Sequence, residues 1–143
     1  MLYQEKPDGF CPDIEAVGCL VIVDNEILML QRPLDHSLYP NLWGFPSGKI
    51  EKEEVPLRAI IRELWQETGI KANGIRFLGK VYIVFPQLSF PYHIFRLDLL
   101  GKPEIEINPD EHVGAKFVNP QDIIEFPHKY IGDTDACIKQ FYR

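Results

Sequence analysis

Apolar residues occur along this chain in short runs that turn residues separate from one another. Residues 15–24 (EAVGCLVIVD) are rich in β-branched and apolar types, which is typical of a buried strand. The pair Asp24-Asn25 favours a turn, and residues 26–32 (EILMLQR) have the composition of a returning strand. The pattern therefore predicts two paired strands in the first part of the chain.

More runs of this kind follow in the second half of the chain. Strands are predicted over residues 75–85, 91–100 and 112–118, and residues 86–90 are expected to join the first two as a hairpin. Few stretches have a helical pattern. This combination predicts an α+β fold, in which helices pack on the faces of a mixed, mostly antiparallel sheet.

The helices are predicted from the residues at their ends. Pro56 suits the first turn of a helix over 55–68, and Gly69 suits a left-handed cap at its C-terminus. Asn119 is expected to cap a second helix, and Asp133 to cap a last one that runs to about residue 141.

The first of these helices carries a polar patch beside its apolar face. On a helix over 54–69, the predicted buried face consists of Leu57, Ile61, Leu64 and Thr68, with Ile60 at its margin. Glu63 and Glu67 stand four residues apart and therefore lie side by side, and Gln66 joins the same patch. Two glutamates at this spacing are ordinary solvated charges in most proteins, so the spacing alone does not identify a site.

Composition limits the kinds of partner and the compartment. A length of 143 residues fits one domain spanning 1–143, and the net charge of −6 argues against binding to a nucleic-acid backbone. A small anionic substrate stays compatible with this charge if metal ions neutralise it locally. The three cysteines have no CxxC spacing, which argues against disulfides and zinc, and no apolar run resembles a signal peptide or a membrane helix. We therefore expect a cytoplasmic protein.

A longer pattern surrounds the two glutamates. Residues 48–70 read GKIEKEEVPLRAIIRELWQETGI, and this segment resembles the Nudix box, G-x5-E-x7-R-E-U-x-E-E-x-G-U, in which U is a bulky aliphatic residue. All specified positions match except one, where Gln66 stands in place of a glutamate. The preceding residues 43–47 (WGFPS) also look like the lead-in that is common in that family.

The resemblance implies a fold, a reaction and a set of site residues. A Nudix-like α/β/α sandwich would hold Mg²⁺ or Mn²⁺ against a pyrophosphate, and water would cleave a nucleoside diphosphate-linked substrate. The residues implied as metal ligands are Ser47 through its carbonyl, Glu63, Gln66, Glu67 and Glu111. Those implied as catalytic are Glu63, Glu67 and Glu111. Arg62 is expected to orient the glutamates by a salt bridge, and Glu54 to be structural.

Gln66 is the departure from the family pattern. An amide offers a neutral carbonyl oxygen and brings no charge, so we expect weaker metal binding, lower activity or a changed number of metal ions. A nucleotide-binding regulatory module with impaired turnover is therefore an alternative of a different class.

Residues outside the box are weaker candidates. Glu111 lies in a loop before a predicted strand, where the family often has Glu-His, and it is a candidate ligand or general base or else a surface charge. The adjacent His112 either assists or is an ordinary packed or solvent-facing histidine. Arg32 is a candidate for binding a phosphate. Trp43 is a candidate for stacking on a base, as are Phe85, Phe126 and Tyr130, although aromatic residues of this kind more often belong to the core.

The resemblance narrows the substrate without fixing it. The length and lead-in look most like small MutT-type pyrophosphohydrolases, which act on nucleoside triphosphates and release a nucleoside monophosphate and pyrophosphate. Pro86 lies 16 residues after Ile70, where ADP-ribose-cleaving relatives often have proline, so ADP-ribose is an alternative, and dinucleoside polyphosphates are another. Family members are often dimers, so a homodimer is a possible assembly, whereas membrane and nucleic-acid partners are not expected.

Overall fold

A mixed sheet forms the centre of the molecule, which is described here from a computed structural model covering residues 1–142. Its strands are β1 (Leu2–Tyr3), β2 (Ala16–Val23), β3 (Glu26–Gln31), β4 (Trp43–Gly44), β5 (Ser47–Lys49), β6 (Arg76–Val84), β7 (Ser89–Asp98) and β8 (Gly114–Val118). The helices are α1 (Pro56–Thr68), α2 (Pro120–Glu125), the short 3-10 turn η1 (Pro127–Lys129) and α3 (Thr134–Phe141).

Strand β2 organises this sheet. It pairs in parallel with β7 along its length and antiparallel with two different strands on its other side. Gly18 is opposite Ser47 of β5, whereas Ile22 is opposite Ile27 of β3. The remaining strands follow in the order β1-β6-β7-β2-β3-β4, with β8 on β3. The expected α+β class with a mixed, mostly antiparallel sheet is confirmed.

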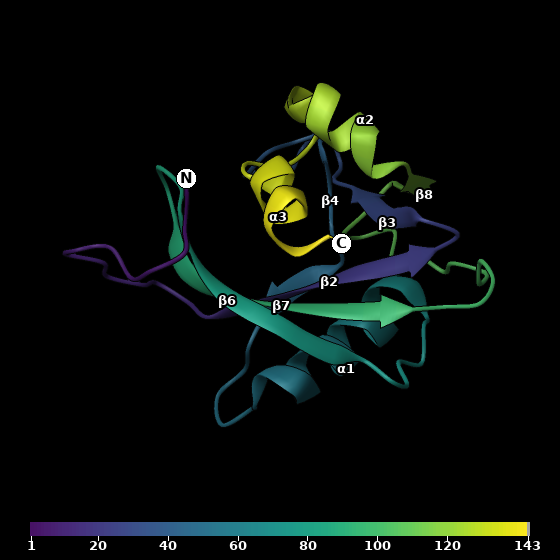
Figure 1. The fold of residues 1–143 in the computed structure, drawn as a ribbon, viewed down its shortest axis with the longest axis horizontal. Coiled ribbons are helices and arrows are strands. Elements are labelled where there is room, and N and C mark those ends of the chain that lie inside the picture. Colours follow the sequence, from purple (N-terminus) through teal and green to yellow (C-terminus); the bar gives the residue numbers. More distant parts are fainter. Residues whose placement is uncertain (143) are drawn as a thin grey trace.

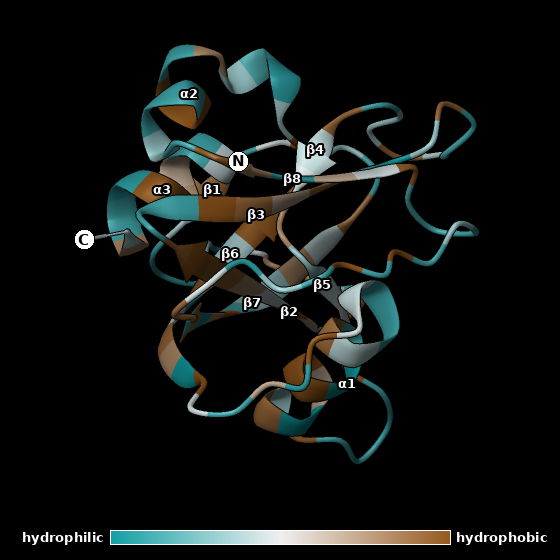
Figure 2. Cartoon of the chain, turned by 90° about the vertical axis from the view of Figure 1, so that its right-hand side faces the viewer, coloured by the Kyte–Doolittle hydropathy of each residue, from teal (hydrophilic) through white to brown (hydrophobic). Residues whose placement is uncertain are grey.

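The helices lie on both faces of the sheet (Figure 1), with α1 on one side and α2 and α3 on the other. Strand β2 is buried over its whole length, because its side chains enter two separate cores in alternation. Leu20 and Ile22 face the core under α2 and α3, whereas Val21 faces the core under α1. Coverage on both faces explains why residues 15–24 form a continuous apolar run. Figure 2 shows hydrophobic residues along the strands at the centre of the sheet.

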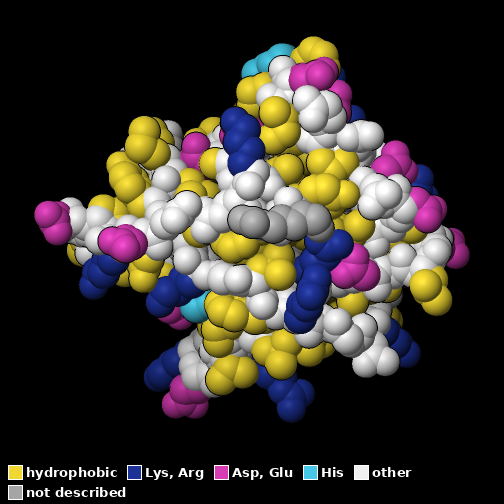
Figure 3. All heavy atoms as spheres, viewed as in Figure 1, with side chains coloured by type: hydrophobic (Ala, Val, Ile, Leu, Met, Phe, Trp, Pro, Cys, Tyr) yellow, Lys and Arg dark blue, Asp and Glu magenta, His cyan; other side chains and the backbone are white. Residues whose placement is uncertain are grey.

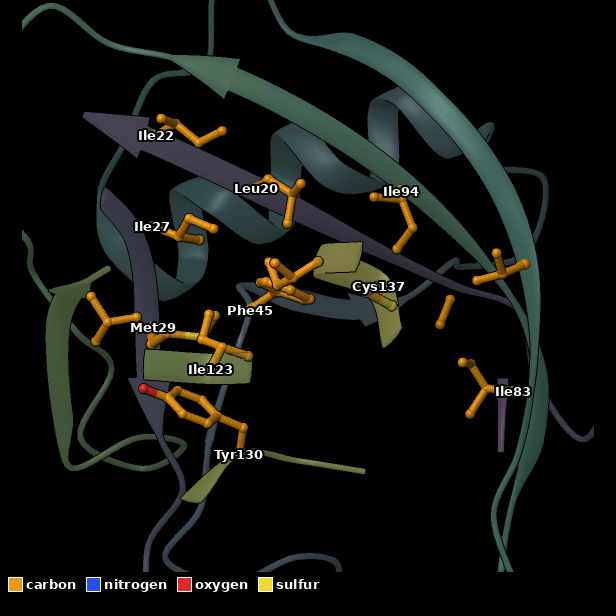
Figure 4. Packing of buried hydrophobic residues seen from close by; sticks show 14 of the residues in the cluster. Leu20, Ile22, Ile27, Met29, Phe45, Ile83, Ile94, Ile123, Tyr130 and Cys137 are labelled. Atoms are coloured by element: carbon orange, nitrogen blue, oxygen red, sulfur yellow. The ribbon is translucent and has the colours of Figure 1, made fainter. Parts of the chain in front are cut away.

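The core under α2 and α3 brings together side chains from distant parts of the sequence (Figure 4). Leu20 and Met29 of the central strands point toward Ile123 of α2 and Tyr130. The hydroxyl of Tyr130 donates a hydrogen bond to the Asp122 carboxylate, which satisfies its polar end inside an apolar environment. Tyr130, a candidate for base stacking, is therefore a core residue with 2% exposure.

The predicted elements agree with the observed ones except near their ends. Strand β7 begins at Ser89 instead of 91, because the connection is a tight turn in which the Phe85 N–H donates to the Leu88 carbonyl (2.9 Å). Strand β8 begins at Gly114 instead of 112. Strands β1, β4 and β5 were not predicted, since two or three residues are too short to show a period.

The expected helix caps have different outcomes. Asn119 caps α2 as expected, because its side-chain oxygen accepts from the Gln121 N–H at 2.8 Å. Gly69 ends α1 in the left-handed region, at φ 75°. Asp133 does not cap α3 through its side chain, so that prediction is wrong. It occupies the cap position of α3, but its side chain makes no capping bond and lies 2.9 Å from the amino group of Met1.

The predicted orientation of α1 is partly wrong. The helix begins at Pro56, so Glu54 precedes it. Its buried face consists of Ala59, Ile60, Leu64, Glu67 and Thr68, whereas Leu57 is 45% exposed. A stripe of apolar residues alone would centre on Ile61 and Leu64. The observed helix is rotated toward Glu67, because the glutamate carboxylate is bonded to β5.

The surface and the thiols complete the description. Figure 3 shows charged side chains of both signs spread between hydrophobic patches on the face seen in Figure 1. Cys19 and Cys137 are buried and Cys11 is exposed, and all three are free. Within residues 1–142, no helix combines the length and apolar character that a membrane crossing requires.

Candidate active site

The C-terminal half of α1 is joined to strand β5 by a buried carboxylate. The Ser47 N–H donates to Oε1 of Glu67 at 2.9 Å, and the Glu67 side chain is only 5% exposed. Residues 47–49 form β5 because they pair with the start of β2, so the sheet fixes the backbone that receives Glu67. The bond aligns the helix and the strand and holds one carboxylate at the junction between them.

Arg62 holds a second group of acidic side chains in place. Its guanidinium donates to both oxygens of Glu54 at 2.9 Å, to Glu63 at 2.7 Å and to the Lys49 carbonyl at 2.9 Å. The Arg62 hydrogen bond lowers the pKa of Glu54 to about 2, so this carboxylate stays ionised. The expected structural roles of Arg62 and Glu54 are in accord with this network, in which the planar guanidinium serves several acceptors at once.

Gly48 allows Glu63 to approach the backbone of β5. A Cβ atom at position 48 would overlap the Glu63 carboxylate. Any other residue there would push that carboxylate away, which gives a physical reason for glycine at this position.

The glutamates of this junction are forced close together in a place where water is scarce. Burial raises the pKa of Glu67 well above its ordinary value, and the neighbouring charge of Glu63 raises it further. Burial also raises the pKa of Glu63, although the Arg62 guanidinium opposes that shift. Crowded, desolvated carboxylates of this kind are stabilised by a cation.

The loop before β8, which follows a segment packed against α1, brings further candidate ligands to Glu67. The N–H groups of Glu111 and His112 both donate to the Asn108 carbonyl, at 3.0 and 2.9 Å, and the Val113 N–H donates to Gln31 of β3 at 2.9 Å. One ligand atom each from Glu67, Glu111 and His112 lies within 4.8 Å of the others. His112 was given little weight from the sequence, because the route of this loop back to α1 depends on the pairing of β8 with β3.

These residues line an acidic cleft of about 530 Å³. Its walls include Glu63, Glu67, Glu111 and His112, together with Arg32 at the end of β3. Burial lowers the pKa of the Arg32 guanidinium, whose Nη1 donates to the Leu38 carbonyl at 2.5 Å. The cleft thus combines carboxylates with a fixed cation, which is an arrangement that suits a metal-bound phosphate chain.

A second, apolar cavity of about 270 Å³ opens from the same place. The residues that line both spaces are Arg32, His36, Gly44, Phe45, Ser47, Gly48, Lys49 and Ile131. The inner wall of the apolar cavity includes Phe85, Leu88, Phe90 and Tyr92 from β7 and the turn before it. An acidic cleft and an aromatic cavity therefore adjoin, with Arg32 at their boundary.

Comparisons with known proteins agree with this arrangement. The family profile of the NUDIX domain matches residues 12–140. This chain belongs to the Nudix family. It is 30% identical to the CTP pyrophosphohydrolase of Escherichia coli K12 over 116 residues, which cover 80% of this chain and 82% of that protein. It is also 37% identical to the 8-oxo-dGTP diphosphatase of Proteus vulgaris over 80 residues, which cover 56% of this chain and 70% of that protein.

Solved structures share the fold of this Nudix protein. A MutT Nudix hydrolase from Burkholderia pseudomallei superposes with a TM-score of 0.77 at 22% identity, covering 89% of this chain and 96% of the other. The Nudix domain of NrtR from Shewanella oneidensis, solved with ADP-ribose, has a TM-score of 0.76 at 19% identity, covering 95% and 90%. Family and relatives together identify the chain as a Nudix hydrolase that acts on the pyrophosphate bonds of nucleotides.

The residues of this Nudix site fit the divalent metal that family members use. The donor set consists of carboxylate oxygens and one imidazole, all hard or borderline ligands for Mg²⁺ or Mn²⁺. His112 Nδ1 is buried and has no hydrogen-bond partner among residues 1–142, and burial lowers the pKa of His112 to about 4, so its ring is neutral at pH 7. A neutral imidazole is the form that binds metals.

Two predicted site residues lie apart from the acidic group. Gln66 is exposed, and its side-chain oxygen accepts from Arg62 at 3.2 Å instead of lining the cleft. The Trp43 ring packs against the Lys116 ammonium, 4.2 Å from its centroid, and lines neither cavity. A further candidate, Phe126, is 40% exposed at the C-terminal end of α2 and also lines neither cavity. Phe85, by contrast, lines the apolar cavity.

Proposed function

We propose that this Nudix hydrolase cleaves nucleoside triphosphates to a nucleoside monophosphate and pyrophosphate with the help of Mg²⁺ or Mn²⁺. The observation that carries the proposal is the junction of the acidic cleft with the aromatic cavity. A nucleotide matches this pair of spaces. Its flat base has apolar faces that suit the aromatic cavity, and its anionic phosphates suit a metal-loaded cleft. The names of two relatives point the same way, because both act on nucleoside triphosphates.

The polar residues divide into three roles. Glu67, Glu111 and the Ser47 carbonyl are the proposed metal ligands, and Glu63 is the proposed acceptor of a proton. Arg32 binds the phosphates at the boundary of the two spaces. Arg62 contacts no substrate in this scheme; it positions Glu63 through the 2.7 Å ion pair.

The reaction is a substitution at phosphorus by water. The water oxygen forms a bond to phosphorus, the bond from that phosphorus to the bridging oxygen breaks, and the bridging oxygen leaves with its electron pair. Glu63 accepts the proton that the water loses. Divalent cations in the cleft supply charge that offsets the charge developing on the phosphoryl oxygens and make water a better nucleophile.

The apolar cavity sets the preference among substrates. Phe85 stacks edge-on against Tyr39 and Phe90, with ring centroids 5.1 and 5.7 Å apart, and so forms a fixed aromatic wall. ADP-ribose is the second candidate, favoured by Pro86 in the turn between Phe85 and Leu88, both of which line this cavity.

A substrate panel tests the proposal. The protein is incubated with CTP, 8-oxo-dGTP, the other nucleoside triphosphates, ADP-ribose and a dinucleoside polyphosphate, each with Mg²⁺ or Mn²⁺, and products are separated by chromatography. The expected result is a nucleoside monophosphate and pyrophosphate from at least one triphosphate, with a higher kcat/KM than for ADP-ribose.

Two outcomes would contradict it. A higher kcat/KM for ADP-ribose than for any nucleoside triphosphate would show that ADP-ribose is the preferred substrate. Nucleotide binding by calorimetry without turnover of any compound would instead support a regulatory module in which Gln66 has impaired catalysis.

A further inference from the structure

The Nudix box of this protein has one carboxylate fewer than the family pattern, and the structure places a histidine where it can donate to the same metal. Gln66 points to Arg62, with 3.2 Å between Oε1 and Nη1, and is exposed outside the acidic cleft. His112 enters the cleft on the loop before β8, and a nitrogen of its ring lies within 4.8 Å of a carboxylate oxygen of Glu67 and of one of Glu111. The acidic group therefore gains a nitrogen donor where the family pattern supplies an oxygen.

The backbone holds His112 in this position. The N–H groups of Glu111 and His112 share one acceptor, the Asn108 carbonyl, and the Asn108 side chain accepts from the Asp110 N–H at 3.1 Å. The next residue, Val113, is bonded to Gln31 of β3. Because these bonds fix the backbone on both sides of His112, its side chain loses little further conformational freedom when it binds a ligand.

The polar atoms of the ring are consistent with this role. Nδ1 is buried with no hydrogen-bond partner in residues 1–142, and a buried polar atom without a partner is costly in a folded protein. A bond from Nδ1 to a metal relieves this cost.

We propose that His112 is a metal ligand in this site and that it shifts the site's preference from Mg²⁺ toward Mn²⁺. The proposal rests on the proposed function, since it concerns the same metal. Mg²⁺ favours oxygen ligands and tolerates nitrogen poorly, whereas imidazole suits first-row transition metals.

The first test is spectroscopic and needs no variant. Mn²⁺ is added to the full-length protein at less than one equivalent, and electron spin-echo measurements look for ¹⁴N coupling to the bound ion. Coupling is expected, because an imidazole nitrogen is bonded to the metal. Bound Mn²⁺ without ¹⁴N coupling would overturn the proposal.

The second test compares affinities by calorimetry. In His112→Ala, the Mn²⁺ affinity is expected to fall roughly tenfold or more, and the Mg²⁺ affinity by less than about threefold. The matched control is His128→Ala, which removes an exposed histidine on η1 far from the cleft and should leave both affinities unchanged. Equal losses for both metals, or no loss, would overturn the proposal.

The tests separate this inference from the proposed function. If wild-type protein hydrolyses nucleotides but shows no ¹⁴N coupling and an unchanged metal ratio in His112→Ala, only the ligand assignment fails. If no nucleotide is hydrolysed while the coupling is present in wild type and absent in His112→Ala, the ligand assignment stands and the proposed reaction fails. Coupling that persists in His112→Ala would assign it to another residue such as His36, which also lines the cleft, and would overturn the proposal. Circular dichroism of both variants shows whether the fold is retained, and His112→Gln replaces His112→Ala if that variant does not fold.

Discussion

The acidic cleft and the apolar cavity adjoin but are built in different ways. Three of the five carboxylates that line the cleft come from residues 47–67, where one helix turn, one glycine and one arginine arrange them. The cavity takes its wall from segments spread between Ile14 and Cys137. The carboxylates proposed to carry the reaction therefore come mainly from one contiguous segment of the sequence. The residues proposed to set substrate preference come from segments that only folding brings together.

The difference also appears in rigidity. Glu54, Glu63 and Glu67 each have a fixed partner. The bonds of Arg62 connect the loop before α1, the helix and β5. The aromatic part of the cavity wall is held mainly by ring contacts and apolar packing. Substitutions in the cleft should therefore change kcat, and substitutions in the cavity should change KM.

The largest effect is expected for Glu67→Gln. This change keeps the shape of the side chain but removes the buried charge that binds the metal, so kcat should fall by roughly 10³-fold. The melting temperature without metal should not decrease, because a desolvated carboxylate is replaced by a neutral group. Steady-state kinetics and thermal melts measure both. Glu104→Gln, at an exposed position, is the control, and retained activity in Glu67→Gln would show that the metal is held elsewhere.

Arg62→Lys should have the next largest effect. Lysine keeps the charge but cannot serve Glu54, Glu63 and the Lys49 carbonyl together, so kcat should fall by about 10- to 100-fold while KM stays nearly constant. The melting temperature should drop by about 3–5 °C. Arg58→Lys on the exposed face of the same helix is the matched control. A change in KM alone would show that Arg62 binds substrate instead.

Phe85→Ala tests the cavity side of the comparison. Loss of a stacking surface worth about 1–3 kcal/mol should raise KM for the preferred nucleotide about tenfold and leave kcat unchanged. Phe77→Ala, which removes a 56% exposed phenylalanine on β6 outside both cavities, should leave KM as it is. If Phe85→Ala lowers kcat and spares KM, the division of labour between cleft and cavity is wrong.

Gln66→Glu should sharpen the role of the missing carboxylate. The added anion near Arg62 and Glu63 is expected to tighten Mg²⁺ binding and raise the rate by about threefold. The effect is small because this side chain is exposed beside the cleft. Gln140→Glu on α3 adds the same charge elsewhere and serves as control. An unchanged or lower rate would mean that the site is adapted to the amide.

The smallest effect concerns stability outside both regions. Burial lowers the pKa of His93 below its ordinary value of 6.5, Glu15 opposes this shift, and Lys80 adds to it. The folded state therefore binds fewer protons at His93 than the unfolded chain, so stability is lost as pH falls below about 6.5. Thermal melts from pH 8 to 5 should show wild type losing more stability than His93→Gln. A parallel decline in both would refute this assignment, and kcat should not differ between them.

Much of the cleft was predictable because its information is local. The spacing from Gly48 to Ile70 indicated the family, and the single departure at Gln66 was visible in the same stretch. The apolar runs and cap residues placed the strands and helices to within about two residues, since both depend on short-range preferences.

Other features depended on tertiary contacts. The rotation of α1 was mispredicted because the Ser47–Glu67 hydrogen bond, and not the apolar stripe, decides which face is buried. The placement of Trp43 against Lys116 depends on the pairing of β3 with β4 and β8, which no local pattern encodes.

The sequence by itself thus determined the family, the longer strands and helices and the identity of the box carboxylates, because each of these is encoded in neighbouring residues. Only the tertiary structure decided that His112 meets Glu67 and that an aromatic cavity opens beside the cleft. Each of these depends on which distant strands pair, and strand pairing is a property of the whole sheet.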